Sequence, residues 1–131
     1  MAAVLIDSTI YIDWERSRQG LTSSLLFFTE SHEVVVCGMV CCEVGGGIRS
    51  AALRGCLKAI WNTLVYVPSD HRIWEASEDL LWNLERKGRR IPLPDAVIAS
   101  CALRVGATVY TRDQHFDLIP GLRVAHRLED L

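Results

Sequence analysis

Four acidic residues of this sequence lie beside or within apolar segments, where a carboxylate is better explained by a functional site than by a solvent-exposed surface. Asp7 follows a short apolar run, Glu43 lies inside an apolar segment, Asp95 opens an apolar segment and Asp113 closes a β-branched one. Carboxylates that gather at one place repel each other unless protons or cations neutralise them. Hard divalent cations such as Mg²⁺ take oxygen ligands and bind phosphate groups. Brought together, these acids predict a metal site suited to phosphodiester hydrolysis.

Each acid alone has a simpler explanation. Asp95 can complete the first turn of a helix, Asp7 and Asp113 can form turns, and Glu43 can be a surface residue. For any single residue these structural explanations are favoured. The hypothesis of a metal site therefore depends on whether the fold brings the four side chains together.

The stretch from Pro92 to Asp113 positions two of these acids. Pro94 and Asp95 suit a first helical turn, and the apolar residues that follow predict a buried helix ending at Gly106. Residues 107–111 are β-branched and aromatic, which predicts a strand. In a parallel sheet, polar residues at the carboxyl ends of strands meet in the crevice where ligands bind. We therefore expect Asp113 to lie near Asp95.

The rest of the chain alternates between strand and helix patterns. Strands are predicted at residues 3–6, 33–37, 64–67, 107–111 and 122–124. Ser8 or Thr9 is expected to cap the first helix, and Gly45–Gly47 predict a break just after Glu43. The alternation predicts an α/β fold with a central parallel sheet of about five strands, covered by helices on both faces.

Length and composition limit the possible classes of protein. A chain of 131 residues, 50% hydrophobic and 23% charged, predicts one folded domain spanning residues 1–131 and excludes disorder. No apolar run approaches the roughly 18 residues of a membrane span, and the first residues lack a signal peptide pattern, so a cytoplasmic protein is expected. The five cysteines lie mainly in apolar segments, which predicts reduced, buried thiols, and their spacing does not favour zinc.

Charge restricts any binding of nucleic acid to local patches. A formal net charge of −2 provides no overall attraction to phosphate. Basic residues that could contact RNA, or equally be solvated surface residues, are Arg49, Arg54, Arg86, Lys87, Arg89, Arg90 and Arg112. His115 could act as a general acid or base, but a structural role beside Phe116 is favoured.

Two other classes of phosphate chemistry fit less well. The glycines at 45–47 do not follow a strand and no Lys-Ser/Thr pair follows them, so a P-loop is not favoured. A receiver-type phosphotransfer domain needs a lysine beyond a late strand, and the only lysines are Lys58 and Lys87. A domain that only binds partners remains a third alternative, against which the presence of four acids argues.

Two predicted helices, at residues 21–30 and 51–61, carry more apolar side chains than one small sheet can bury. The residues concerned are Leu25, Leu26, Phe27, Phe28, Leu57, Ile60 and Trp61. Part of this surface is therefore expected to form a groove between the two helices, suited to an amphipathic partner helix.

The order of these motifs resembles the PIN domain, specifically the VapC toxins of toxin–antitoxin pairs. The resemblance is carried by four segments, Asp7-Ser8-Thr9 after the first strand, Glu43 after the second, Pro94–Ala99, and Thr111–Phe116 before Pro120-Gly121-Leu122. It implies a three-layer α/β/α fold in which Asp7, Glu43, Asp95 and Asp113 are the metal-site acids. Thr111 would be a hydroxyl neighbour and Asp117 an outer member of the site.

The resemblance also implies an activity and partners. The expected function is Mg²⁺- or Mn²⁺-dependent cleavage of RNA, restrained by a cognate VapB-type antitoxin, in a protein that forms a homodimer. Within the same fold, the alternatives are a PIN nuclease of RNA processing that is not a toxin, and a PIN-fold binding module without catalytic activity.

Overall fold

The computed structural model describes residues 3–131 and contains one five-stranded sheet. The strands are β1 (Ala3–Ile6), β2 (Glu33–Cys37), β3 (Val65–Val67), β4 (Thr108–Tyr110) and β5 (Val124–Ala125). Their order is β3-β2-β1-β4-β5, and every neighbouring pair is parallel. The predicted parallel sheet of about five strands is confirmed.

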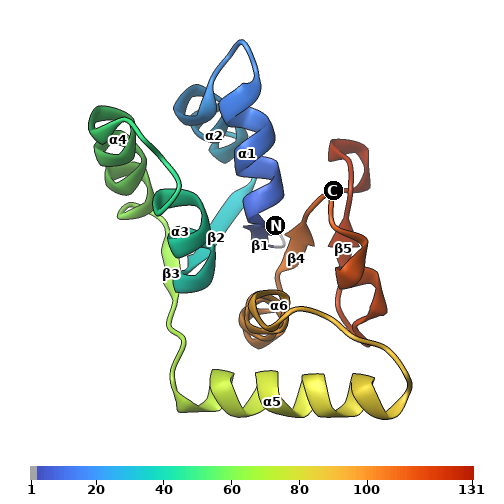
Figure 1. Cartoon of the computed structure of the whole chain (residues 1–131). Helices are drawn as coiled ribbons and strands as arrows, with labels where there is room; N and C mark the ends of the chain where they lie inside the picture. The colour runs from blue at the N-terminus through green and yellow to red at the C-terminus, as the bar shows by residue number, and fades with distance from the viewer. Residues whose placement is uncertain (1–2) are drawn as a thin grey trace.

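Helices lie on both sides of this sheet, as predicted for three layers (Figure 1). The helices are α1 (Ser8–Arg16), α2 (Leu21–Thr29), α3 (Gly38–Gly45), α4 (Ala51–Trp61), α5 (His71–Arg86) and α6 (Leu93–Val105). On one side of the sheet lie α1, α2 and α4, and on the other α6 lies between the sheet and α5 (Figure 1). Two short 3-10 helices, η1 (Gln114–Leu118) and η2 (Leu128–Asp130), complete the fold.

The buried residues follow the apolar runs of the sequence. β1 and β2 are interior strands of the sheet, and their side chains from Val4 to Ile6 and from Val34 to Cys37 are buried. Helix α6 is buried continuously from Asp95 to Ala102, because it packs against the sheet on one side and α5 on the other. It ends at Gly106, whose φ of 68° is a left-handed conformation that glycine adopts without steric cost.

The break predicted after Glu43 is confirmed, because helix α3 ends at Gly45, within the run of glycines. Two other local predictions differ from the structure. Asp7, not Ser8 or Thr9, is the N-cap residue of α1. The last strand lies at Val124–Ala125 instead of 122–124, because pairing with β4 begins only where Val124 lies opposite Val109.

The pairing of β1 with β4 determines where polar side chains meet. Ile6 lies opposite Tyr110, and the amide of Asp7 donates a hydrogen bond of 2.9 Å to the Tyr110 carbonyl. The segments that follow these two strands therefore leave the sheet side by side at its carboxyl edge. Among residues 3–131, no helix is both long and apolar enough to cross a membrane.

The five cysteines are all free, but they are not all buried as predicted. Cys37 and Cys101 lie in the core, whereas Cys42 and Cys56 are exposed and Cys41 is half-buried. Cys42 and Cys56 belong to helices with one solvent-facing side, and the apolar character of the neighbouring sequence did not reveal which side each residue occupies.

Candidate metal centre

Asp95 is the most deeply placed acid of the α6 segment. It lies in the first turn of α6, after Pro92 as N-cap residue, and is only 8% exposed. Its Oδ2 atom is buried and has no hydrogen-bond partner among the described residues. An unpartnered carboxylate oxygen is costly to bury, so this atom indicates a place for a proton or a cation.

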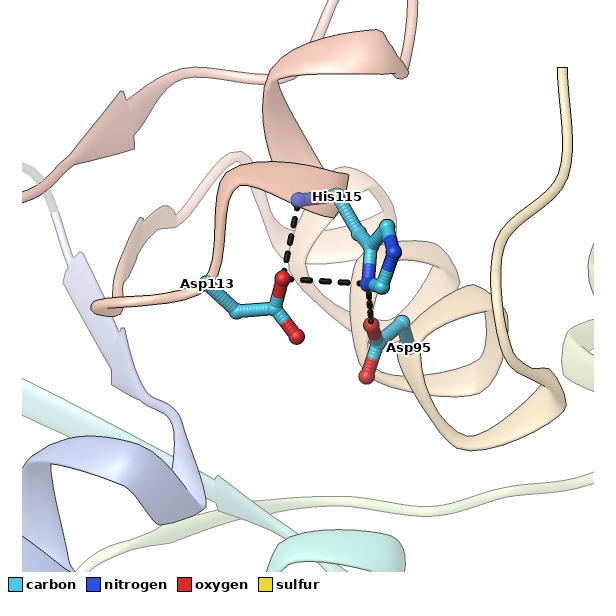
Figure 2. Close-up of side chains that lie close together, drawn as sticks. All are labelled: Asp95, Asp113 and His115. Carbon is cyan, nitrogen blue, oxygen red and sulfur yellow. Dashed lines mark hydrogen bonds and ion pairs between the residues drawn. The ribbon is translucent and has the colours of Figure 1, made fainter.

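Asp113 and His115 face Asp95 from the segment after β4 (Figure 2). Asp113 is the N-cap residue of η1, and its Oδ1 accepts the amide hydrogen of His115 at 2.9 Å. The Nδ1 atom of His115 lies 3.0 Å from Oδ1 of Asp113 and 3.4 Å from Oδ2 of Asp95. One ligand atom from each of the three residues lies within 4.8 Å of the others, close enough to share one cation.

Asp7 is tied to the same edge by two hydroxyl groups. Its Oδ2 accepts hydrogen bonds from Thr9 at 2.9 Å and from Thr111 at 2.8 Å, and the residue is 2% exposed. Thr111 also accepts the amide hydrogen of Asp113 at 2.9 Å. Thr111 therefore connects Asp7 with Asp113, and its hydroxyl orients these two residues.

Glu43 lies on α3 and has an exposed side chain. Its pKa is raised by partial burial and by the nearby charge of Asp7, and it is lowered in part by a hydrogen bond with Ser8. Glu43 therefore approaches the centre from the Asp7 side. It does not belong to the group of three residues formed by Asp95, Asp113 and His115.

Burial and negative charge together disfavour ionised Asp95. Burial, the charge of Asp113 and the charge of Asp7, in that order, raise the pKa of Asp95 to about 7, and His115 opposes this shift. A divalent cation would neutralise the same repulsion and occupy the unpartnered Oδ2 atom. The residues present therefore fit a hard divalent cation, held mainly by oxygen ligands.

His115 is the residue whose position the sequence analysis misjudged. A structural role was favoured, but the structure places its imidazole against both carboxylates, with a side chain 47% exposed. The available signal was the Asp-x-His spacing directly after a strand, because an Asx turn places the second residue after an aspartate beside its carboxylate. Its neighbour Phe116 is fully buried and anchors η1 in the core.

Asp117 and Arg112, two other candidates, are engaged elsewhere. Asp117 forms an ion pair with His126 at 2.9 Å, so its carboxylate is directed to the chain near β5. Arg112 pairs with Asp13 at 3.0 Å, and its side chain also donates to the His126 carbonyl. Asp117 is thus a partner of His126, and Arg112 stabilises the segment after β4.

The apolar residues of α2 and α4 divide into buried and exposed groups. Leu25, Phe28, Leu57 and Trp61 are in the core, whereas Leu26 and Phe27 are 52% and 65% exposed. A hollow of about 450 Å³ lies beside α4, against α3 and β3, and is lined by Cys41, Cys42, Gly45, Gly46, Arg54, Lys58, Trp61, Asn62 and Tyr66. The groove expected between α2 and α4 stays a prediction. The exposed apolar side chains available to it on α2 are those of Leu26 and Phe27.

A three-layer α/β/α fold with acids at the carboxyl edge of a parallel sheet defines a class that includes metal-dependent nucleases. A family model of the PIN domain matches residues 4–122. The chain belongs to the PIN domain family. This assignment replaces the receiver-type alternative. No curated protein is similar to the chain in sequence at a significant level.

Solved structures with the same fold include several toxin–antitoxin proteins. A chain of VapBC2 from Rickettsia felis, solved with a promoter DNA fragment, matches with a TM-score of 0.72 at 18% identity, over 94% of this chain and 97% of that chain. A chain of DNA-bound VapBC from Salmonella typhimurium gives 0.72 at 21% identity, over 95% and 98%. VapC20 from Mycobacterium tuberculosis, described as a sarcin–ricin loop cleaving toxin, gives 0.62 at 14% identity, over 87% and 92%. At these identities the likeness establishes the shared fold.

Proposed function

We propose that this protein is a VapC-type toxin, an endoribonuclease that hydrolyses RNA phosphodiester bonds with the help of Mg²⁺ or Mn²⁺. The observation that carries the proposal is the buried Oδ2 of Asp95, which has no hydrogen-bond partner among the described residues and lies in the group that Asp95 forms with Asp113 and His115 (Figure 2). Membership of the PIN domain family and the fold shared with VapBC complexes support it.

Each acid has a role in this proposal. Asp95 and Asp113 supply oxygen ligands, and Asp7 contributes from the junction of β1 and α1, where the hydroxyls of Thr9 and Thr111 hold its carboxylate. Glu43 completes the acidic site from the Asp7 side. When bound, a divalent cation of this kind activates water and stabilises the leaving oxygen of the phosphodiester.

RNA would be held by local basic residues near the acids. Lys87 and Arg89 are exposed in the segment between α5 and α6, directly before the helix that carries Asp95. Arg90 and Arg112 are paired with Glu85 and Asp13, which reduces the charge they offer to phosphate. The contribution of Lys87 and Arg89 is electrostatic, so binding of RNA should weaken as salt rises.

The proposed partners are a VapB-type antitoxin and a second copy of the chain. An amphipathic antitoxin segment would cover the exposed Leu26 and Phe27 of α2 and extend along α4. A homodimer would use another helical surface, and α5 offers the exposed side chains of Trp74 and Trp82. These proposals place a cytoplasmic toxin under the control of a small protein encoded beside it.

The decisive experiment measures cleavage of total cellular RNA by the purified chain. Wild-type protein should cut RNA with Mg²⁺ or Mn²⁺, stop when a chelator is added and recover when metal is restored. Asp95→Asn and Asp7→Asn should be inactive yet folded, while Asp79→Asn, at an exposed position of α5, should retain activity. Cleavage that survives both the chelator and Asp95→Asn would overturn the proposal.

A growth experiment tests the toxin part separately. Expression of the chain alone should arrest growth, and co-expression with the small protein encoded next to it should restore growth and yield a complex on purification. A nuclease that is harmless and binds no neighbour-encoded protein would contradict the toxin assignment. The metal-dependent nuclease would then remain.

A further inference from the structure

The imidazole of His115 occupies the position of a metal ligand. Its Nδ1 atom lies 3.0 Å from an Asp113 oxygen and 3.4 Å from an Asp95 oxygen. Neighbouring ligands of an octahedral ion with bonds of about 2.1 Å lie about 3 Å apart. The two distances from Nδ1 are close to those between adjacent ligands of one cation, and one ligand atom from each of the three residues lies within 4.8 Å of the others (Figure 2).

Hydrogen bonding alone does not account for this arrangement. Oδ2 of Asp95 is buried and has no hydrogen-bond partner among the described residues, although Nδ1 of His115 is only 3.4 Å away. Oδ1 of Asp113 already accepts the amide hydrogen of His115. The ring thus directs Nδ1 at the two acids, while the buried Oδ2 of Asp95 has an ion-pair distance to His115 but no hydrogen-bond partner among the described residues. A cation in contact with all three atoms would supply it.

The backbone fixes where the imidazole can be. Asp113 caps η1, and Phe116, directly after His115, is completely buried in the core. His115 is therefore attached to a segment held on both sides, and its ring reaches the acids without a change of backbone. A ligand held on such a segment loses little conformational freedom when it binds a metal.

From these contacts we propose that His115 binds the divalent cation through Nδ1, together with Asp95 and Asp113, and so makes the site selective for Mn²⁺ over Mg²⁺. The proposal rests on the metal site of the proposed function and adds a nitrogen ligand to it. Imidazole nitrogen is a good ligand for first-row transition ions, whereas Mg²⁺ prefers oxygen ligands and retains water. The exchange of one oxygen ligand for nitrogen therefore changes which ion the site prefers.

The test uses the full chain, stripped with a chelator and titrated with Mn²⁺ or Mg²⁺ in the absence of RNA. Electron spin-echo spectroscopy of bound Mn²⁺ detects a directly coordinated nitrogen through its modulation of the signal. Wild-type protein should show this modulation, and [¹⁵N]histidine labelling should change it to the nitrogen-15 pattern. His115→Gln should abolish it and weaken Mn²⁺ binding at least about tenfold, with Mg²⁺ binding changed less than about threefold.

His71→Gln is the matched control. His71 is also an exposed histidine beside a carboxylate, 2.6 Å from Glu75, but it lies on α5 away from the acidic group. Its substitution should leave both the modulation and the metal affinities unchanged. The labelled wild-type spectrum gives the assignment to histidine even if His115→Gln folds poorly.

The possible failures are distinguishable. Mn²⁺ that binds wild-type protein without nitrogen modulation, or modulation that persists in folded His115→Gln, would overturn the role of His115 and leave the acidic metal site in place. Equal affinity of wild-type protein for Mg²⁺ and Mn²⁺ would overturn the selectivity. Failure of wild-type protein to bind either ion would overturn the metal site itself and the proposed function with it.

Discussion

Removing the charge of Asp95 should abolish activity and at the same time stabilise the metal-free protein. The structure raises the pKa of this carboxyl from 3.8 to about 7, chiefly through burial and then through Asp113 and Asp7. A raised carboxyl pKa means that ionised Asp95 is disfavoured in the folded state. The resulting loss of unfolding free energy is absent below pH 3.8, grows between pH 3.8 and 7, and is complete above pH 7.

The magnitude follows from the size of the shift. A difference of about 3 pKa units corresponds to about 4 kcal/mol of unfolding free energy at pH 8. Asparagine also removes a favourable charge from the first turn of α6, which costs roughly 0.3–1 kcal/mol. We therefore expect Asp95→Asn to be more stable than wild type by about 2–4 kcal/mol at pH 8, and to have nearly equal stability at pH 4.

Urea unfolding in chelator at pH 4, 6 and 8 measures this directly, with Asp79→Asn as a control for removal of an exposed charge. Adding Mn²⁺ at about 100 times its dissociation constant should raise the stability of wild type by about 2.7 kcal/mol and leave Asp95→Asn unchanged. An Asp95→Asn variant that is no more stable than wild type at pH 8, or that gains as much at pH 4, would refute the electrostatic reasoning.

Four further perturbations test other contacts. Thr111→Val should lower the unfolding free energy by about 1–3 kcal/mol, because Asp7 loses a buried hydrogen bond, and this can be measured by urea unfolding. The pKa of His126 is raised by its bond to the Thr111 carbonyl and, despite some burial, by Asp117, so His126→Gln should reduce stability most below pH 6.5, with the difference shrinking as pH rises through the folded-state pKa. Phe27→Glu should prevent co-purification with the antitoxin without loss of nuclease activity. Trp82→Ser should convert the proposed homodimer to a monomer in sedimentation experiments, because Trp82 is an exposed apolar side chain of the α5 surface.

Control variants separate these effects from general destabilisation. Thr63→Val removes an exposed hydroxyl that bonds only to its own helix turn, and it should cost well under 1 kcal/mol. Val105→Glu changes an exposed apolar residue at the end of α6, outside the hollow that Phe27 lines, and should leave antitoxin binding intact. A Thr111→Val variant as stable as Thr63→Val, or a loss of stability in His126→Gln that grows with pH, would contradict the assigned contacts.

Much of the fold was predictable because short-range signals agree with the final packing. The β-branched run at 33–37 became β2 with the same bounds, and the apolar helix that follows Pro92 ends at Gly106 as predicted. The start of α1 was misjudged because Ser, Thr and Asp are all good N-cap residues, and three of them follow one another at 7–9. Thr9 instead gives its hydroxyl to Asp7, a choice that depends on contacts with the distant Arg112.

The site could be predicted only in part, because contacts between residues distant in the sequence position some of its side chains. The proximity of Asp95 and Asp113 follows from the placement of a helix start and a strand end at one sheet edge. The position of Glu43 depends on the length of α3, which the three glycines made difficult to judge. The place of His115 beside both acids depends on a turn and a ring orientation, for which the Asp-x-His spacing is the only signal in the sequence.

The adjacency of β1 and β4 also determines when a functional molecule can exist during folding. The first half of the chain contains β1, β2 and helices α1–α3, but only two of the four acids of the proposed metal site, Asp7 and Glu43. The amide of Asp7 meets the Tyr110 carbonyl across more than a hundred residues, and such long-range parallel pairing forms slowly. Recovery of metal binding after dilution from denaturant should therefore lag behind recovery of helix signal, and molecules arrested halfway would be well structured yet harmless to RNA.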